Sequence, residues 1–307
     1  MSGGKKALIA FLALSVCIFL GLTIFSLINR KSATDKKTSS AGKASSVSAA
    51  KNNTSSNSKK ASSSAVKSSS SAAVKKSTAD RTKEYVYKNN PELTPVNYDS
   101  PALLGLTEDA GIAYRDKLYF ICDSPTYWMW PYGLLGGGKD TKQIWTGPEH
   151  TQTLAYQSTF KIVDPFDNQE KLIIEVVQAH KPEYIVIAMG INGVAIMTEE
   201  EFIEEYTDLV TKIQLISPKT KILLSSIYPI TKAYKNWGII TNATITKANS
   251  NILKIAEDTN THYIDTFAAI VGDDGEAKKE YMRDDGLHPN EAGLTEILNY
   301  IRTHAYL

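Results

Sequence analysis

Three residues in this sequence have the types and spacing needed to cleave an ester. Ser124 stands in the pair Asp123-Ser124, directly after a short apolar run, where a hydroxyl is exposed and held in position. Asp285 and His288 lie three residues apart, so both side chains can face the same way. A serine attacks an ester only when a base lies within hydrogen-bond reach. Asp285 could accept a hydrogen bond from one imidazole nitrogen of His288 while the other nitrogen reaches Ser124.

The pattern alone leaves simpler roles open for the same residues. Ser124 could only cap a helix after the strand, as serine often does. Asn192 could stabilise a turn, and Asp285-Gly286 is itself a turn signal. Asp284 could take the place of Asp285 if the register of the loop differs. An Asp-x-x-His spacing also arises by chance in a chain of this length, so the surrounding elements have to decide.

Apolar runs alternate with helical patterns and predict the elements that position these residues. Four short runs read as buried strands: residues 117–122, 184–189, 221–227 and 262–264. Helical spacing of apolar residues begins at Leu172, Phe202, Ile245 and Leu294, and Thr198 with Glu201 forms a capping box before the second of these helices. This alternation predicts a mostly parallel sheet covered on both faces. Ligands bind at the carboxyl ends of such strands, where Ser124, residues 190–192 and Asp265 fall.

Taken in chain order, four groups of residues resemble a known family. They are Asp123-Ser124 after the first strand, Gly147, residues 190–192 in the pattern Gly-Ile-Asn, and Asp285-x-x-His288 before the last helix. Together they look like the four sequence blocks of the SGNH (GDSL-like) hydrolases. The resemblance covers residues 115–305. It implies an α/β protein with a flavodoxin-like three-layer α/β/α fold and a mostly parallel sheet of about five strands.

The resemblance also implies a role for each matching residue. Ser124 would be the nucleophile, His288 the general base and Asp285 the group that orients it. The oxyanion hole would consist of the Ser124 backbone N–H, the Gly147 N–H and the side-chain amide of Asn192. Donors that converge on a developing oxyanion are often the largest single contribution to such catalysis.

The sequence departs from the family pattern at two positions. Cys122 replaces the usual glycine before Asp-Ser, and Gly193 replaces the aspartate that usually follows Gly-x-Asn. Neither position supplies a reacting group. The donor assigned to Gly147 could come instead from the glycines at 136–138. The Gly-x-Ser-x-Gly motif of the α/β-hydrolases is absent around Ser124, which disfavours that other serine-hydrolase fold.

Aromatic residues follow the candidate nucleophile closely. Tyr127, Trp128 and Trp130 could wall a substrate pocket or stack on a sugar, although core packing would explain them equally well. His150, His180, His262 and His304 have no further ligands at metal-binding spacing, so we expect neither a metal nor another cofactor.

Charge divides the chain into two unlike parts. The chain has 34 basic and 33 acidic residues. Residues 1–80 contain 13 of the basic and 2 of the acidic residues, and residues 81–307 contain 21 basic and 31 acidic residues. The later part therefore has a net charge of −10, which argues against a nucleic-acid ligand because phosphate binding needs clustered Lys and Arg. We assign residues 1–30 to an anchor, 31–82 to a disordered Ser/Lys/Ala-rich linker and 83–307 to the hydrolase domain.

The anchor prediction comes from residues 7–28, which contain no charge and would span about 33 Å as a helix. A cleaved secretory signal is the alternative, but its apolar segment is normally shorter. Basic residues after this stretch outnumber those before it, which would place the domain in the cytoplasm. We nevertheless expect it outside a bacterial cell membrane, because a long cationic linker suits a domain that must reach into an anionic cell-wall polymer. The linker could bind that polymer, or it could equally be a solvated spacer with no partner of its own.

These observations predict a single-pass, membrane-tethered, extracytoplasmic serine esterase or acyltransferase. Its substrates would be O-acyl esters, above all O-acetyl esters, of a cell-wall or other carbohydrate. The alternative is a non-catalytic carbohydrate-binding module on a stalk, in which Cys122 and Gly193 reflect a decayed site.

Overall fold

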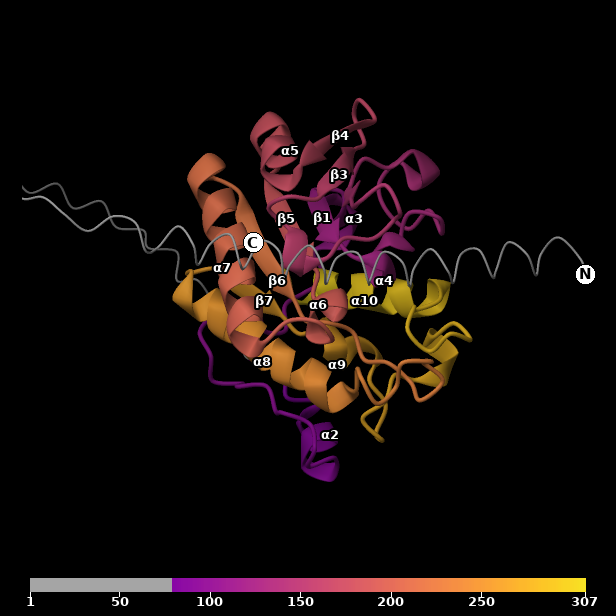
Figure 1. Ribbon diagram of the computed structural model, residues 1–307. Helices are drawn as coiled ribbons and strands as arrows, with labels where there is room; N and C mark the ends of the chain where they lie inside the picture. The colour runs from indigo at the N-terminus through magenta and orange to yellow at the C-terminus, as the bar shows by residue number, and fades with distance from the viewer. Residues whose placement is uncertain (1–78) are drawn as a thin grey trace, which may run out of the picture. The chain divides into compact units, whose positions relative to one another are not determined.

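The computed structural model describes residues 79–307, which form one compact unit around a parallel sheet (Figure 1). The predicted anchor and the linker up to residue 78 lie outside the described residues. Residues 79–82, the end of the predicted linker, contact the domain, and Arg81 pairs with Asp99 at 2.7 Å. No helix within residues 79–307 has the length and apolar character needed to cross a bilayer.

Five parallel strands make up the sheet in the order β2-β1-β5-β6-β7. Their bounds are β1 (Leu118–Cys122), β2 (Ile144–Trp145), β5 (Tyr184–Ala188), β6 (Lys221–Ser225) and β7 (His262–Ile264). The four predicted strands are thereby confirmed, and β2 is the fifth. Its two residues pair with Phe120 and Ile121 at the edge of the sheet.

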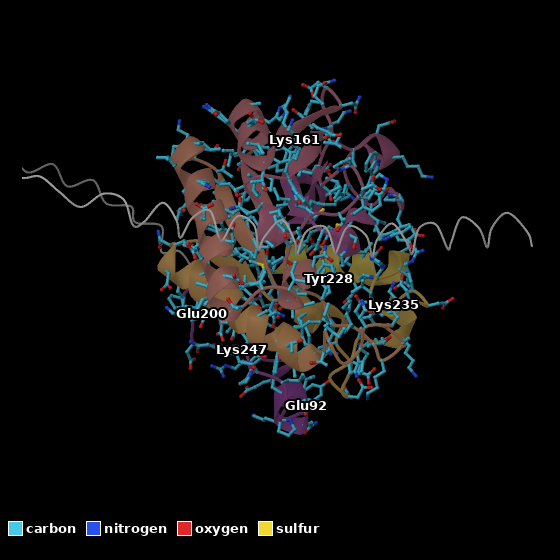
Figure 2. All side chains as sticks on the ribbon, in the orientation of Figure 1. Glu92, Lys161, Glu200, Tyr228, Lys235 and Lys247 are labelled. Atoms are coloured by element: carbon cyan, nitrogen blue, oxygen red, sulfur yellow. The ribbon has the colours of Figure 1, made fainter. Side chains whose placement is uncertain are left out.

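Helices cover both faces of the sheet, as the predicted three-layer fold requires. Alternate side chains of each strand enter different cores: Ile121 and Ile187 pack on one face, and Phe120 and Val186 on the other. The first core is closed by α5 (Ile173–His180), α7 (Glu199–Ile216) and α8 (Asn242–Asp258), and the second mainly by α10 (Glu291–Thr303) and α3 (Gly111–Arg115). Charged side chains such as Lys161, Glu200 and Lys247 lie at the surface, whereas Tyr228 is buried (Figure 2).

The long helix α7 begins where its capping box predicts. The Glu201 N–H donates to the Thr198 hydroxyl at 3.2 Å, and the Glu201 carboxylate accepts the Thr198 N–H at 3.0 Å. These two bonds satisfy backbone donors that the first turn of a helix leaves without partners. Shorter elements complete the domain: α2 (Glu84–Asn89), α4 (Ser124–Tyr127), α6 (Ile191–Val194), α9 (Thr266–Ile270), and a hairpin of β3 (Lys161–Asp164) and β4 (Gln169–Leu172).

Candidate active site

Ser124 and His288 meet at the carboxyl ends of the strands although they are far apart in the chain. Ser124 is the first residue of α4 and follows β1 by two positions. Its Oγ lies 2.9 Å from Nε2 of His288, and the other ring nitrogen, Nδ1, lies 3.0 Å from Oδ2 of Asp285. With the ring proton on Nδ1, the imidazole donates to the carboxylate and accepts from the serine hydroxyl. This arrangement can move a proton from Ser124 to His288.

The loop between Met282 and the start of α10 fixes the geometry of Asp285. Its Oδ1 accepts the backbone N–H groups of Leu287 and His288, each at 2.9 Å. Partial burial favours the neutral carboxyl, but these N–H donors and the imidazole outweigh it and hold the pKa of Asp285 below its ordinary value. Asp285 therefore stays ionised beside the histidine. Asp284, the alternative partner, is exposed and forms no hydrogen bond or ion pair with His288 within the described part of the chain, where Asp285 holds both.

Gly286 lets the loop that carries Asp285 and His288 pack against a second loop. It adopts φ +70°, and a Cβ at this position would lie 2.5 Å from the Tyr234 backbone nitrogen. Its carbonyl accepts the Thr231 N–H at 2.9 Å. A side chain at residue 286 would be strained and would push the 231–234 segment away. The glycine predicted as a turn signal is thus required for both the turn and the close approach.

Asp123, next to the candidate nucleophile, ties β1 to the turn after β5. Its carboxylate accepts the N–H groups of Gly190 and Ile191 at 3.1 and 3.2 Å. Complete burial raises the pKa of this carboxyl to about 7 against the lowering effect of the two bonds. Asp123 is also the N-cap residue of α4, although no side chain caps that helix. The Ser124 side chain therefore does not act as a cap, and Cys122 is the buried last residue of β1.

The three candidate oxyanion donors are not equally available. The Ser124 N–H donates to no group within residues 79–307. By contrast, the Gly147 N–H donates to the Thr151 carbonyl at 3.0 Å, and the Asn192 amide donates to the Thr151 hydroxyl at 3.0 Å and to the Gln152 carbonyl at 2.9 Å. A single loop, residues 147–152, thus occupies two of the donors that the sequence predicted. Among the alternatives at 136–138, the N–H groups of the first and third glycines also have partners within their own turn region.

Each of the three predicted aromatic residues has another ring as a neighbour, and Trp130 lies against Tyr127 with centroids 5.9 Å apart. The Tyr127 ring stacks on His150 with centroids 4.4 Å apart, and Trp128 lies edge-on to His288 at 6.4 Å. The Arg283 guanidinium lies 3.8 Å from the centre of the Trp128 ring, and its Nε is 3.8 Å from Asp285. Arg283 could not be predicted as part of the site from the sequence, because its aromatic partner lies in a different part of the chain. Arg283 links the Trp128 ring to the carboxylate that orients the histidine.

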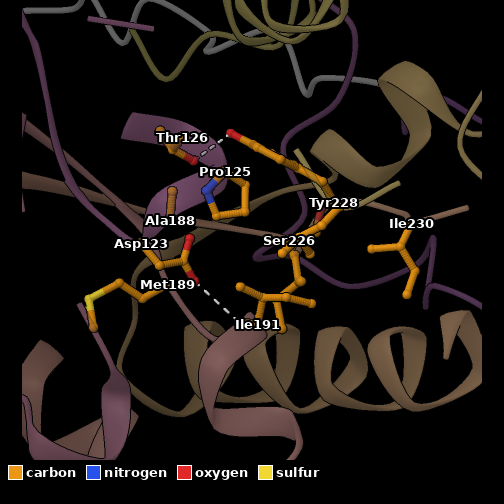
Figure 3. A pocket seen from close by; sticks show the side chains of 11 residues that line it. Asp123, Pro125, Thr126, Ala188, Met189, Ile191, Ser226, Tyr228 and Ile230 are labelled. Carbon is orange, nitrogen blue, oxygen red and sulfur yellow. Dashed lines mark hydrogen bonds between the residues drawn. The ribbon is translucent and has the colours of Figure 1, made fainter. Parts of the chain in front are cut away.

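A narrow pocket lies between α4 and the ends of β5 and β6, and the two residues that flank Ser124 in the chain line it (Figure 3). Asp123 and Pro125 form one side, and Ile191, Tyr228 and Leu287 line the remainder. In Figure 3 the Tyr228 hydroxyl meets that of Thr126, at 2.9 Å. The free space measures about 10 Å³, which is close to the room that one water molecule needs.

No cluster of metal-binding side chains occurs within residues 79–307. His180 does contact a carboxylate, since its Nε2 lies 2.9 Å from Asp164. Lys171 pairs with the same aspartate at 2.7 Å. These contacts join α5 to the β3–β4 hairpin, so the histidine has a structural partner.

Comparison with known proteins finds a family match for part of the chain. Residues 159–294 match the model of the GDSL-like lipase/acylhydrolase family, a range that contains Asn192, Asp285 and His288 and begins after Ser124. A search of curated proteins gave no match.

Several solved structures resemble this one at low sequence identity. A candidate platelet activating factor from Streptococcus pneumoniae is 20% identical, with a TM-score of 0.46 over 73% of this chain and 90% of that one. A lipolytic protein of the G-D-S-L family from Desulfitobacterium hafniense is 18% identical, with a TM-score of 0.42 over 60% and 97%. A Geobacillus acetyl-xylooligosaccharide esterase is 24% identical, with a TM-score of 0.34 over 43% and 64%. Residues 159–294 thus form a GDSL-like lipase/acylhydrolase segment, which makes the protein an SGNH-type ester hydrolase or acyltransferase.

Proposed function

We propose that this enzyme works through an acyl-enzyme formed on Ser124. The observation that carries the proposal is the 2.9 Å contact between Ser124 Oγ and His288 Nε2, with Asp285 on the far side of the ring. His288 takes the hydroxyl proton as Oγ bonds to the acyl carbon, and returns it to the alcohol that leaves. Water or a second alcohol then attacks the acyl-enzyme, His288 takes its proton, and Ser124 is regenerated.

Oxyanion stabilisation starts with the Ser124 N–H in this proposal. The Gly147 N–H and the Asn192 amide join it once the 147–152 loop releases them. One such donor typically contributes about 3 kcal/mol to lowering the barrier. Two observations support this assignment: the Ser124 N–H has no partner within residues 79–307, and Gly147 and Asn192 follow β2 and β5, the two strands that flank β1.

The proposed substrate is a short-chain O-acyl ester, above all an O-acetyl ester, of a carbohydrate. The narrow pocket lined by the two chain neighbours of Ser124 supports a short acyl group, because apolar side chains such as Ile191 and Leu287 leave little free space there. A carbohydrate alcohol fits the aromatic side chains around the site, since sugar rings stack on such surfaces. A non-catalytic module has no need for a serine hydroxyl bonded to an oriented histidine, so we do not favour that alternative.

We further propose that residues 7–28 anchor the enzyme in a bacterial cell membrane and that residues 31–82 extend the 83–307 domain toward the cell wall. The uncharged stretch and the composition of the linker support this placement. A tether of this kind would keep the active site near esters of wall polymers.

Replacement of Ser124 by alanine tests the proposed chemistry. The purified full-length chain should hydrolyse 4-nitrophenyl acetate faster than the octanoate ester, and Ser124→Ala should lower kcat by a factor on the order of 10⁴ to 10⁶. Ser158→Ala serves as the matched control because Ser158 is exposed. Thermal melting of both variants shows whether the fold is intact. Equal rates for Ser124→Ala and the parent chain would rule out the acyl-enzyme.

A further inference from the structure

We propose that a polar cavity at the end of β2 binds the alcohol part of the ester and selects a saccharide that carries an acidic group. The cavity measures about 230 Å³. That is below the roughly 300 to 1,000 Å³ of pockets that enclose a drug-sized ligand, so it suits one sugar-sized unit of a longer chain. This proposal rests on the proposed function, because it takes Ser124 as the point of attack.

The position of the cavity relates it directly to the candidate active site. Thr146 and Gly147, which follow β2, form part of its wall. Since β1 lies between β2 and β5 in the sheet, the cavity and the narrow pocket flank the strand that leads to Ser124 on its two sides. The Tyr127–His150 stack joins α4 to the same wall. An ester with its acyl group in the narrow pocket would therefore extend its alcohol toward the cavity.

Aromatic rings on the wall can bind the apolar face of a sugar. Trp130 is 36% exposed, and its ring stands nearly perpendicular to that of His150, at 88° and 6.4 Å. The Trp130 indole N–H donates to the Lys139 carbonyl at 2.7 Å, which fixes the orientation of the ring. A fixed aromatic surface beside polar groups is the combination that sugar rings require, because they present both C–H faces and hydroxyl edges.

Two lysines give the cavity a positive character within an acidic domain. Lys139 and Lys142 line it together with a single carboxylate, Asp140. Neither ammonium forms an ion pair with a carboxylate in the part of the chain that the structure describes, whereas Lys117 pairs with Glu183 at 3.0 Å. Lys142 donates one proton to the Pro165 carbonyl at 2.6 Å, which holds the ammonium at the rim and leaves two protons for a ligand.

Unpaired ammonium groups select anions, because charge-assisted hydrogen bonds are stronger than neutral ones. A carboxylate or phosphate on the sugar would satisfy both lysines. The surrounding domain has a net charge of −10 and would repel the same polymer elsewhere. The cavity would therefore fix where along an acidic saccharide the enzyme acts.

Kinetics with matched sugars test the proposal on the full-length chain. The substrates are O-acetylated trigalacturonic acid, its neutral galactose counterpart and an O-acetylated sugar phosphate. The double variant Lys139→Gln/Lys142→Gln should lower kcat/KM about tenfold or more on an acidic substrate, mainly through KM, and leave the neutral sugar and 4-nitrophenyl acetate unchanged. The acidic substrate whose kcat/KM the double variant lowers identifies the anion that the cavity binds, carboxylate or phosphate. The control variant, Lys117→Gln/Lys219→Gln, removes the same amount of charge at the amino ends of the strands, away from the cavity.

A binding measurement on an inactive variant tests the cavity independently of the proposed chemistry. Calorimetry with trigalacturonic acid on Ser124→Ala should show binding that Lys139→Gln/Lys142→Gln weakens and that galactotriose does not reproduce. Unchanged binding, or equal losses on acidic and neutral sugars, would overturn the cavity proposal. Failure of the parent chain to cleave any ester would overturn the proposed function. The calorimetry would still show whether the cavity binds an acidic saccharide.

Discussion

Two aspartates near Ser124 differ in ionisation because their surroundings differ. Asp123 is fully buried, and burial raises the pKa of its carboxyl to about 7 although two N–H groups bond to it. Asp285 is only partly buried, and the donors around it prevail and lower its pKa. The charge needed beside His288 is thus available at neutral pH, while Asp123 changes charge in that range.

The raised pKa of Asp123 predicts how stability depends on pH. The folded protein keeps a proton on this carboxyl up to about pH 7, whereas the unfolded chain loses it near the ordinary value of 3.8. The free energy of unfolding should therefore fall as the pH rises from about 4 through 7. The melting temperature of Asp123→Asn should decrease less between pH 5 and 8 than that of the parent chain. Each kcal/mol lost from the free energy of unfolding lowers Tm by about 2 to 4 °C in a domain of this size.

Scanning calorimetry at several pH values makes the comparison. Asp265 has a similar environment, since burial also raises its pKa to about 7, so part of the decrease should remain in the variant. Asp258→Asn, at an exposed position, should follow the parent curve. A decrease in Asp123→Asn as steep as in the parent chain would contradict the proposed burial effect.

At the scale of elements, the proposed oxyanion stabilisation requires a local rearrangement of the 147–152 loop. It accepts hydrogen bonds from both Gly147 and Asn192, so a substrate oxygen can use those donors only in exchange for Thr151 and Gln152. The acceptors in the loop resemble the ester oxygen in their chemistry. The loop therefore competes with the substrate for the same N–H groups.

Substitutions of the donor and of the acceptor in the Asn192–Thr151 hydrogen bond show whether Asn192 holds the loop in place or stabilises the oxyanion. Asn192→Ala removes the donor and should lower kcat for 4-nitrophenyl acetate by about 10²- to 10³-fold. Thr151→Val removes only the hydroxyl that Asn192 bonds to, and should leave kcat equal or higher. If both variants lower kcat equally, Asn192 acts only through the loop.

The strands that the sequence predicted are those whose apolar runs are continuous. β1, β5, β6 and β7 are buried on both faces, and such runs carry a clear signal. β2 has only two residues, too few to show any periodicity, and β4 has no buried residue. Ser124, Asp285 and His288, which the structure brings together, could be predicted from the sequence because they stand at fixed places beside these strands and in recognisable blocks. The contacts of Arg283 and of the 147–152 loop were not found, because they join segments that only the tertiary fold brings together.

At the scale of the whole molecule, the uneven charge of the chain bears on its location. The 13 basic and 2 acidic residues before residue 81 precede an acidic domain, and the distribution around residues 7–28 favours a cytoplasmic domain by the positive-inside count. We instead propose an external one. Protease added to intact cells should remove the domain and leave a cytoplasmic marker protein intact on a blot. Protection of the domain would support the charge count and contradict the proposed placement.

The contact between Ser124 and His288 also has a consequence for the time at which activity first appears. The two residues are separated by 164 positions. At about 5 to 20 residues per second, synthesis of the intervening chain takes roughly 10 to 30 seconds. During this interval His288 does not yet exist, so by the proposed mechanism a nascent chain cannot acylate itself on esters that it meets before its fold is complete.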